Sequence, residues 1–597
     1  MEKTRDQIEP QYQWDLTKIY PDMKAFRQEY DEVKQLISEY QKYEGHTMDD
    51  AQTFYQSVVD ELTISEKLGI LYTYTSLKSD EDIANNQNQE LKSRVQNLYD
   101  YAMRTMYFTT PELLKVDYQV IEQFYQDEPR LLDYETLIKE KFRYQKHTLS
   151  DAEEKLLSQL SKAFGNDETV YNYLKDSDMS FGMIHDEQGS LVPLTNTNFS
   201  IYIGSQDRAV RKEAFETLYD YYRQFRNTIT ATFDGTIKQN VAIAKLRHYK
   251  SAFLASLYAD DMDPKVYETL VATVHQHLDV FHQYLALRKE VLQLDEVHLY
   301  DVYADMIPAT QKTYSFSEGK ELVLQSLSIL GEDYLTNLKR AFLERWIDIY
   351  PNQNKLGGAY SGGAYGTNPY VLLNYQGKIH DVSTLAHELG HSMHSFYTRN
   401  NQPYQYGDYP IFVAEVASTV NELLFAKYML RHSTSKDEKL SILNSLLELF
   451  KGTIYRQVMF AEFEKYAYDL IEQDDVITAD KLCGTYYDLN KQYFGDQVVV
   501  DEAIQYEWEK VPHFFSQFYV YKYATGLSAA CKIVTDIEAG KEGALERYLE
   551  MLKSGSRQSP LETLKIAGVD MLDPTVVESA IAMFQDTIEE FKKEMNS

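Results

Sequence analysis

The stretch Asp381-Val-Ser-Thr-Leu-Ala-His387-Glu388-Leu389-Gly390-His391 contains the spacing His-Glu-x-x-His within a helical pattern. Residues four apart lie on one face of a helix, so the imidazoles of His387 and His391 can converge on one ion. Imidazole nitrogen suits Zn²⁺, with bonds of about 2.0–2.1 Å. Glu388 can reach a water at the metal without binding the metal, which is the placement that a general base needs. The motif therefore predicts a helix that carries a zinc site.

Two further residues of this helix bear on that prediction. Gly390 in a helix interior costs about 1 kcal/mol relative to alanine. A helix accepts that cost where another backbone must pack close, so Gly390 predicts such a contact. His394, three residues after His391, is a rival ligand, but three His from one short helix would crowd the metal. We therefore expect His394 to pack, or to support a ligand, rather than to bind the ion.

A catalytic zinc normally has three protein ligands and one open position, so a third ligand is expected. A second helical pattern begins after Pro410 and carries Glu415 among mostly apolar residues. An isolated buried carboxylate is costly unless it is paired or binds a metal. Glu422, two turns further along roughly the same face, is the alternative ligand or a hydrogen-bond partner for a ligating His. The residue pattern favours Glu415 and leaves Glu422 open.

Five of the 25 glycines fall within residues 354–368, directly before a strand-like run at residues 369–375. Glycine beside a strand lets another backbone approach closely. If this strand lies at the edge of a sheet, an extended peptide could pair with it by β-addition. A mobile surface loop is the alternative explanation of the same composition.

Apolar residues at steps of three and four predict helices through most of the chain, in which Gly and Pro are sparse. The clearest segments are residues 24–43, 51–78, 85–108, 207–247, 264–293 and 438–472. A hairpin with a Gly-containing turn is expected within residues 178–205. These patterns predict a mainly α fold, with an N-terminal helical lobe at residues 1–200 and a second domain at residues 201–597 that carries the metal motif.

Composition excludes several classes of protein. The 597 residues include 60 Lys and Arg against 92 Asp and Glu, a formal charge of −32, which argues against nucleic-acid binding and against anionic membrane surfaces. No apolar run approaches the length of a membrane span, and the first residues lack the apolar core of a signal peptide. Two cysteines, Cys483 and Cys531, rule out a disulfide framework. We therefore expect a cytoplasmic protein.

Tyrosine is unusually frequent, with 50 Tyr against 27 Phe and 3 Trp. Tyr pairs an apolar ring with a hydroxyl, so it suits both helix contacts and polar-edged cavities. Tyr519 and Tyr523 follow His513 and are four residues apart, which would place them on one helix face. Phenol and imidazole N–H groups could stabilise the oxyanion formed when water attacks an amide. An aromatic packing stripe would explain the same spacing. Weaker candidates for a polar channel are Tyr360, Tyr365 and Tyr521.

Five stretches of the sequence combine in a way that is specific to one family. They are Trp14-Asp-Leu, Gly357-Gly-Ala-Tyr-Ser-Gly-Gly, His387-Glu-Leu-Gly-His391, Phe412-Val-Ala-Glu415-Val-Ala-Ser-Thr-Val-Asn-Glu422, and Pro512-His513-Phe with Phe518-Tyr519-Val-Tyr521-Lys-Tyr523-Ala-Thr-Gly526. Together they resemble the thimet-type oligopeptidases, peptidase family M3, and within that family the bacterial oligoendopeptidase F group. The resemblance spans essentially the whole chain and is strongest from about residue 350 to 530.

The resemblance implies two helical lobes that enclose a deep substrate channel, with a small β element beside the zinc-binding helix. It implies one Zn²⁺ per chain, held by His387, His391 and Glu415, and Glu388 as the general base. The choice of Glu415 over Glu422 thus rests more firmly on the resemblance than on spacing.

The resemblance also assigns roles to the later segment. His513, Tyr519 and Tyr523 match, in residue type, family residues that contact the substrate carbonyl and the oxyanion. Eukaryotic members carry a further Tyr at the position that is Gly526 here. This departure leaves open how the hydrogen bonds are divided, and Tyr521 could compensate.

The implied activity is zinc-dependent hydrolysis of internal bonds in short, unstructured peptides by metal-activated water. The partners would then be peptides, without nucleic acid or membrane. A zinc carboxypeptidase or dipeptidyl carboxypeptidase is the alternative enzyme, although no cationic residue that would hold a substrate C-terminus can be singled out. A non-catalytic helical peptide-binding scaffold is the alternative from another class, and an intact Glu388 with a three-ligand set speaks against it.

Overall fold

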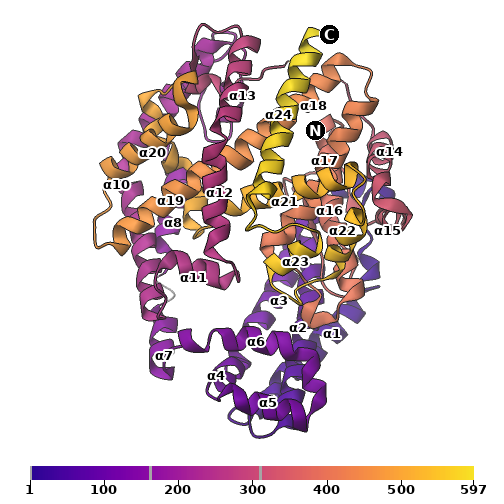
Figure 1. Cartoon of the computed structure of the whole chain (residues 1–597). Coiled ribbons are helices and arrows are strands. Elements are labelled where there is room, and N and C mark those ends of the chain that lie inside the picture. Colours follow the sequence, from indigo (N-terminus) through magenta and orange to yellow (C-terminus); the bar gives the residue numbers. More distant parts are fainter. Residues whose placement is uncertain (1–2, 161–163, 308–311) are drawn as a thin grey trace. The chain divides into compact units, whose positions relative to one another are not determined.

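Helices account for most of the computed structural model, in which residues 3–160, 164–307 and 312–597 are described (Figure 1). Strands among these residues are confined to three small sheets, so the prediction of a mainly α fold is confirmed. Within the described ranges, no helix combines the length and hydropathy that a bilayer crossing requires. Cys483 and Cys531 are both buried, and neither takes part in a disulfide.

The chain divides into two compact units, and each unit is built from three segments. Unit 1 contains residues 1–148, 312–428 and 536–568, and unit 2 contains residues 149–311, 429–535 and 569–597. The metal motif therefore belongs to unit 1, and the segment from His513 to Tyr523 belongs to unit 2. The predicted division into residues 1–200 and 201–597 stays a prediction, as does the enclosed channel.

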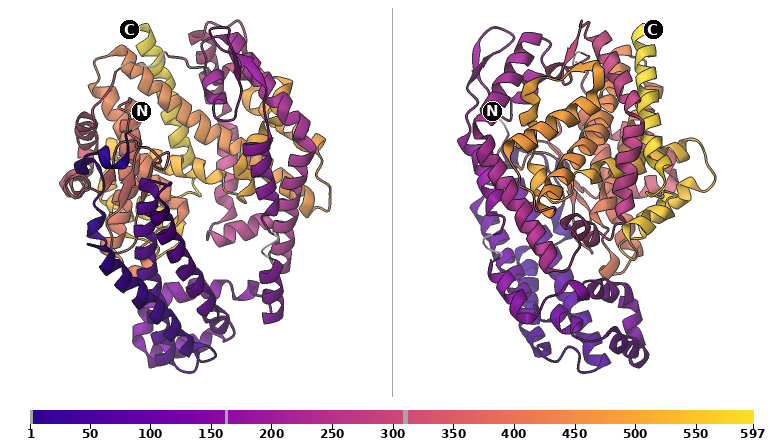
Figure 2. Two further views of the ribbon diagram at one scale, coloured as in Figure 1. Left: turned by 180° about the vertical axis from the view of Figure 1, so that it is seen from behind. Right: turned by 60° about the vertical axis from the view of Figure 1, so that its left-hand side comes forward.

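Unit 1 consists of helices around a small sheet. Its helices are α1 (Met23–Tyr40), α2 (Ala51–Glu81), α3 (Asn86–Thr105), α4 (Thr109–Leu114), α5 (Tyr118–Asp127), α6 (Glu135–Arg143), α14 (Phe316–Ser326), α15 (Gly331–Leu343), α16 (Ile379–Asn401), most of α17 (Ile411–His432), α22 (Ala544–Lys553) and α23 (Pro560–Ile566). Figure 2 shows the indigo helices α1, α2 and α3 packed alongside one another. Their core also includes Trp14, Tyr370 and Leu372, so the sheet and these helices share apolar contacts.

The sheet of unit 1 corrects the expectation for the strand at residues 369–375. Its strands are β4 (Ile347–Asp348), β5 (Tyr360–Gly362) and β6 (Tyr370–Leu372), in the order β4-β6-β5. β6, for which an edge position was considered, is the central strand and is buried throughout. The edge strands are β4 and β5, and β5 forms inside the Gly-rich segment and pairs antiparallel with β6. A continuous apolar run such as β6 fits a strand that is covered on both faces.

Residues 3–20, which we call the N-terminal strap, bind to this sheet through main-chain hydrogen bonds. Ile349 N donates to Tyr12 O at 3.0 Å, and Asp15 N donates to Arg345 O at 2.9 Å, on either side of β4. The Tyr370 hydroxyl of β6 donates to the carbonyl of Asp15 at 3.1 Å. The strap therefore connects the start of the chain to strands that are more than three hundred residues away.

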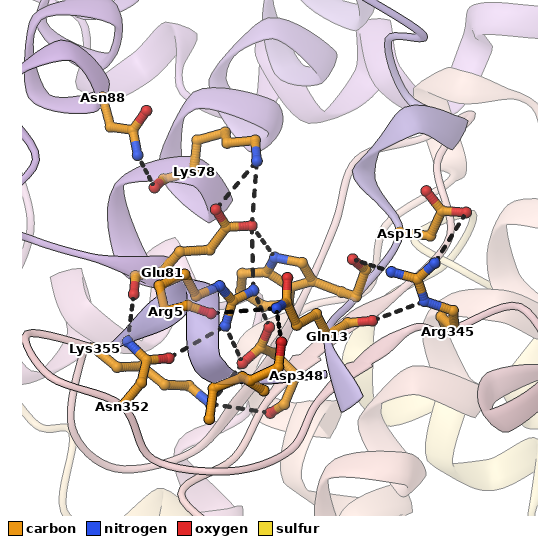
Figure 3. A network of polar contacts seen from close by, with 12 residues as sticks. Arg5, Gln13, Asp15, Lys78, Glu81, Asn88, Arg345, Asp348, Asn352 and Lys355 are labelled. Atoms are coloured by element: carbon orange, nitrogen blue, oxygen red, sulfur yellow. Dashed lines mark hydrogen bonds and ion pairs between the residues drawn. The ribbon is translucent and has the colours of Figure 1, made fainter. Parts of the chain in front are cut away.

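Buried charges reinforce the strap, as Figure 3 shows. Arg5 donates to Asp348 of β4 at 2.8 Å, and Lys355 lies 2.7 Å from the same carboxylate. The Trp14 indole N–H donates to Glu81 at the end of α2 at 2.7 Å. Because Asp348 is fully buried, loss of either cation would leave a charge poorly compensated. This network holds the strap, α2 and the segment leading to β5 together.

Unit 2 is almost entirely helical. Its helices are α7 (Asp151–Leu160), α8 (Asn166–Tyr173), α9 (Phe199–Ile203), α10 (Arg208–Leu246), α11 (Ala252–Ala259), α12 (Pro264–Gln276), α13 (Leu278–Val291), α18 (Lys436–Phe450), α19 (Arg456–Glu472), α20 (Ala479–Phe494), most of α21 (Tyr521–Glu538) and α24 (Pro574–Asn596). Its strands are β1 (Met183–His185), β2 (Leu191–Pro193), β3 (Val297–His298) and β7 (Val498–Val499). β1 and β2 form the predicted antiparallel hairpin.

Two helix predictions in unit 2 differ in detail from the structure. The segment 264–293 forms two helices, because the backbone leaves the helical region at His277. The segment 438–472 is continuous, but it contains a π-helical turn at Lys451–Tyr455 between α18 and α19. Periodicity alone distinguishes neither feature from a regular helix.

Candidate metal centre and active site

His387 and His391 of α16 and Glu415 of α17 form a group that could hold a metal ion, with one ligand atom of each within 4.8 Å of the others. The Glu415 Oε2 atom lies 3.6 Å from His387 Nε2 and 3.5 Å from His391 Nε2. All three side chains are partly exposed, which leaves the group accessible to a ligand. The structure thus brings together the three residues for which metal binding was predicted.

A close helix crossing at Gly390 positions Glu415 opposite the two His. A Cβ atom at Gly390 would lie 2.5 Å from Ser418 Cα and 2.6 Å from the carbonyl oxygen of Ala417, both on α17. The prediction that another backbone packs against Gly390 is therefore confirmed. Asn421 of α17 also donates to the carbonyl of Ala386 at 3.1 Å, which ties the two helices together on the same side.

Glu422 contacts His387 and is not one of the three residues that could hold the metal ion. Its carboxylate lies 3.2 Å from His387 Nδ1. A carboxylate oxygen accepts hydrogen bonds, so this contact favours the tautomer with the proton on Nδ1, in which Nε2 is available to an ion on the side of Glu415. This contact matches the alternative role considered for Glu422, a partner of a ligating His. Hydrogen bonding to His391 lowers the pKa of Glu415 to about 2 despite its burial, so this carboxylate is ionised at neutral pH.

Glu388 is buried on α16 between the two His, and its burial raises its pKa. Its carboxylate accepts a hydrogen bond from the backbone N–H of Ser361 in the edge strand β5. The Ser361 hydroxyl also contacts the buried Ser392 hydroxyl at 2.8 Å, and Ser392 donates to the carbonyl of Glu388 at 3.0 Å. Sequence reasoning missed these two serines. The only available signal was the position of Ser361 between two pairs of glycines.

His394 and Tyr360 both serve packing. The His394 ring is fully buried, stacks on Tyr409 with 3.6 Å between the ring centroids, and has no hydrogen-bond partner among the described residues. Burial lowers its pKa to about 3, so it is neutral. This agrees with the packing role expected for His394. The Tyr360 hydroxyl donates to Asp80 of α2 at 2.7 Å, which fixes the outer end of β5.

In unit 2, His513, Tyr519 and Tyr523 form one aromatic cluster. The Tyr523 hydroxyl lies 3.4 Å from His513 Nε2, and the centroids of Tyr519 and Tyr523 are 5.2 Å apart. Burial lowers the pKa of His513. The prediction that both tyrosines share a helix face is wrong, because α21 begins at Tyr521 and Tyr519 lies in the turn before it. Tyr521 points into the core and is buried, so it does not join the cluster.

The comparisons with known proteins agree on one family. The sequence profile described as "Peptidase family M3" matches residues 201–583, and the profile described as "Oligopeptidase F" matches residues 112–181. The chain is 41% identical to "Oligopeptidase PepF" of Bacillus subtilis, and the match covers 99% of this chain and 88% of the relative. It is 38% identical to "Group B oligopeptidase PepB" of Streptococcus agalactiae, and that match covers 99% of this chain and 98% of the relative. The crystal structure of oligoendopeptidase-F from Enterococcus faecium matches with a TM-score of 0.74 at 32% identity, covering 96% of this chain and 99% of that chain.

Proposed function

The chain belongs to peptidase family M3 and is a peptidase, and on this premise we propose that it is a zinc-dependent endopeptidase that cleaves internal bonds of short, unstructured peptides. The observation that carries the proposal is the convergence of His387, His391 and Glu415 beside the buried carboxyl group of Glu388. Peptides are its substrates, and we expect it to act on them in the cytoplasm.

The donor set fits zinc. Two imidazole nitrogens and one carboxylate oxygen are a common ligand set of catalytic zinc. Tetrahedral ligands at about 2.1 Å from an ion are about 3.4 Å apart, close to the 3.6 and 3.5 Å between Glu415 Oε2 and the Nε2 atoms of His387 and His391. The hydrogen bond from His387 Nδ1 to Glu422 supports the Nε2 atom as the ligand. We therefore assign the ion to His387, His391 and Glu415, one per chain.

Glu388 is the proposed general base. When bound, zinc would supply a Lewis acid that polarises the peptide carbonyl and lowers the pKa of water toward 7. Glu388 accepts a proton from the water as its oxygen attacks the carbonyl carbon, and it returns that proton to the amine as the C–N bond breaks. Its raised pKa favours this exchange, because a base works best when its pKa lies near the operating pH. The N–H of Ser361 keeps the carboxyl group oriented.

His513, Tyr519 and Tyr523 are proposed to bind the substrate carbonyl and the developing oxyanion. A phenol hydroxyl and a neutral imidazole N–H are both donors. Such donors stabilise a transition state when they point at the atom where negative charge develops, and loss of one costs about 3–4 kcal/mol. The mutual contacts of the three rings support a common role.

The edge strand β5 supports the preference for unstructured peptides. An extended peptide can add to a free strand edge through main-chain hydrogen bonds, whereas a folded protein offers few such segments. β5 has β6 on one side only, and its Ser361 contacts Glu388. A peptide paired with β5 would therefore lie beside the general base.

The decisive experiment uses a quenched fluorescent peptide that is blocked at both ends. We expect cleavage at an internal bond, inhibition by a chelator and recovery with zinc. A carboxypeptidase would need a free C-terminus and would leave the blocked peptide intact, and a scaffold would show no turnover for a chelator to inhibit. Glu388→Gln should keep the zinc and lose nearly all turnover. Near-normal turnover of that variant would overturn the assignment of Glu388 as the base.

A further inference from the structure

Phe518, between the 3₁₀ turn Pro512–Phe515 and α21, has an unusual backbone conformation. Its φ angle is +48°, in the left-handed region that residues with bulky side chains rarely occupy. Such a conformation costs on the order of 1–3 kcal/mol and persists only when its surroundings impose it. Tyr519 follows immediately, so the turn at Phe518 positions Tyr519 relative to His513, which precedes the turn in the same cluster. The contacts that impose this turn are therefore of functional interest.

Glu464 of α19 provides the polar contact to this turn. Its Oε1 atom accepts a hydrogen bond from the backbone N–H of Phe518 at 2.6 Å. The residue is fully buried, and Oε2 has no hydrogen-bond partner among the described residues. Burial raises the pKa of Glu464 well above its ordinary value. A buried carboxyl group with a single partner is costly to stability, so its position here calls for a role other than stability.

Apolar and polar contacts from two helices hold the same turn. The Phe518 ring packs edge-on against Phe253 of α11, with centroids 4.9 Å apart, and against Tyr468 of α19, at 4.6 Å. Gln517 donates to the carbonyl of Ala252 at 2.8 Å, which adds a second tie to α11. These contacts fix the Phe518 ring and the preceding residue. Within the part of the chain that the structure describes, Glu464 alone accepts a hydrogen bond from the Phe518 N–H.

We propose that Glu464 is a positioning residue, which holds the strained turn at Phe518 so that His513, Tyr519 and Tyr523 form one donor cluster. The inference rests on the proposed role of that cluster in peptide hydrolysis. Without the acceptor, the N–H of Phe518 would be buried and unsatisfied in an unfavourable conformation, and the turn would relax. A displacement of about 1 Å in a catalytic group can cost about 10²-fold in rate. Glu464 itself touches neither substrate nor metal in this scheme.

The test compares Glu464→Leu with Glu464→Gln. Leucine removes the acceptor, and we expect kcat to fall roughly 10- to 100-fold with KM within about twofold and zinc content unchanged. Glutamine keeps an acceptor oxygen of the same reach for the Phe518 N–H, so it should restore most of kcat. If Glu464 had only a structural role, both variants would unfold at a lower temperature, and their kcat values would not differ in this way.

A matched control is Glu112→Leu in unit 1. Glu112 also holds a turn by accepting from backbone N–H groups, those of Gly45 at 2.6 Å and Thr47 at 3.1 Å. Its loss should lower stability and leave kcat unchanged. If Glu464→Leu fails to fold, Glu464→Asp replaces it, since the shorter side chain withdraws the acceptor from Phe518 and keeps the acid. The proposal predicts a reduced kcat for Glu464→Asp beside a near-normal Glu464→Gln.

Tyr523→Phe and His513→Asn, measured in the same assay, test the proposed role of the cluster separately from the positioning role of Glu464. If these variants keep full kcat, the proposed role of the cluster in hydrolysis is wrong. If they lose kcat while Glu464→Leu, or Glu464→Asp in its place, keeps it, the cluster stands and the positioning role of Glu464 is overturned. Equal losses of kcat in Glu464→Gln and Glu464→Leu would also overturn it, because the acceptor would then not be what matters.

Discussion

Replacing Gly390 with alanine should separate the two helices that carry the metal group. The new Cβ atom would lie 2.5 Å from Ser418 Cα, whereas an ordinary contact is at least 3.4 Å, so α17 must move by about 0.9 Å. Both nearest atoms belong to the α17 backbone, which cannot rotate aside as a side chain can. Glu415 is three residues from Ser418 and moves with it. The shift is nearly half of a zinc–ligand bond of about 2.1 Å.

We expect Gly390→Ala to lose activity out of proportion to stability. Alanine gains about 1 kcal/mol of helix propensity, and overpacking costs about 1–3 kcal/mol, so the free energy of unfolding should fall by no more than about 2 kcal/mol. A displacement of about 1 Å in a positioned group can reduce kcat/KM about 10²-fold. The assays are kcat/KM on the blocked fluorescent peptide, zinc content by metal analysis, and thermal unfolding.

The matched control is Gly484→Ala on α20, where a Cβ atom would meet nothing within 4 Å. It should gain about 1 kcal/mol in helix propensity and keep full activity. Gly390→Ala with normal kcat/KM and full zinc content would refute the reasoning. It would mean that the crossing of α16 and α17 tolerates the extra atom or does not control the position of Glu415.

Three further predictions follow from other contacts. Glu422→Gln weakens the support of His387 and should reduce zinc affinity about 10- to 100-fold in competition with a chelator, and an unchanged affinity would remove Glu422 from the metal centre. Ser392→Ala breaks the contact to Ser361 and should lower kcat/KM about tenfold at constant zinc content, whereas unaltered kinetics would reduce the pair to packing. Burial raises the pKa of Glu509 to about 9, so the folded state retains a proton that the unfolded state releases near pH 4.5, and the contribution of Glu509 to stability falls as pH rises from about 4.5 to about 9. Glu509→Gln should remove that loss, giving a gain on the order of 5 kcal/mol at pH 8 in denaturant unfolding, at about 1.4 kcal/mol per pH unit above 4.5. A gain that did not grow with pH would contradict it.

Local information predicted much of the fold. Helical periodicity located α1, α2, α3 and α10, because a repeat of 3.6 residues is a local property. The break at His277 and the π turn before Arg456 were not predictable, since each leaves the apolar spacing nearly intact. The edge strand β5 was missed because three residues among glycines carry no period, and its pairing with β6 is decided by tertiary contacts.

The contrast between local spacing and tertiary contacts also applies to the candidate site. His387, Glu388 and His391 are neighbours on one helix turn, so their convergence could be predicted from spacing alone. Which of Glu415 and Glu422 lies beside the two His depends on where α17 crosses α16. Gly390 predicted only that another backbone packs against α16. Glu464 could not be found from the sequence, because nothing near it in the chain indicates a turn 54 residues later.

The N-terminal strap makes the order of synthesis matter for unit 1. Arg5 emerges from the ribosome long before Asp348, the residue with which it pairs, because Asp348 is translated 343 residues later. At roughly 5–20 residues per second, that interval lasts on the order of 20–70 s. During it, the guanidinium of Arg5 lacks the carboxylate with which it pairs in the folded protein. Arg5 is thus made early and reaches its native contact late, and a slow closing phase of the strap, monitored by tryptophan fluorescence, should depend on Arg5.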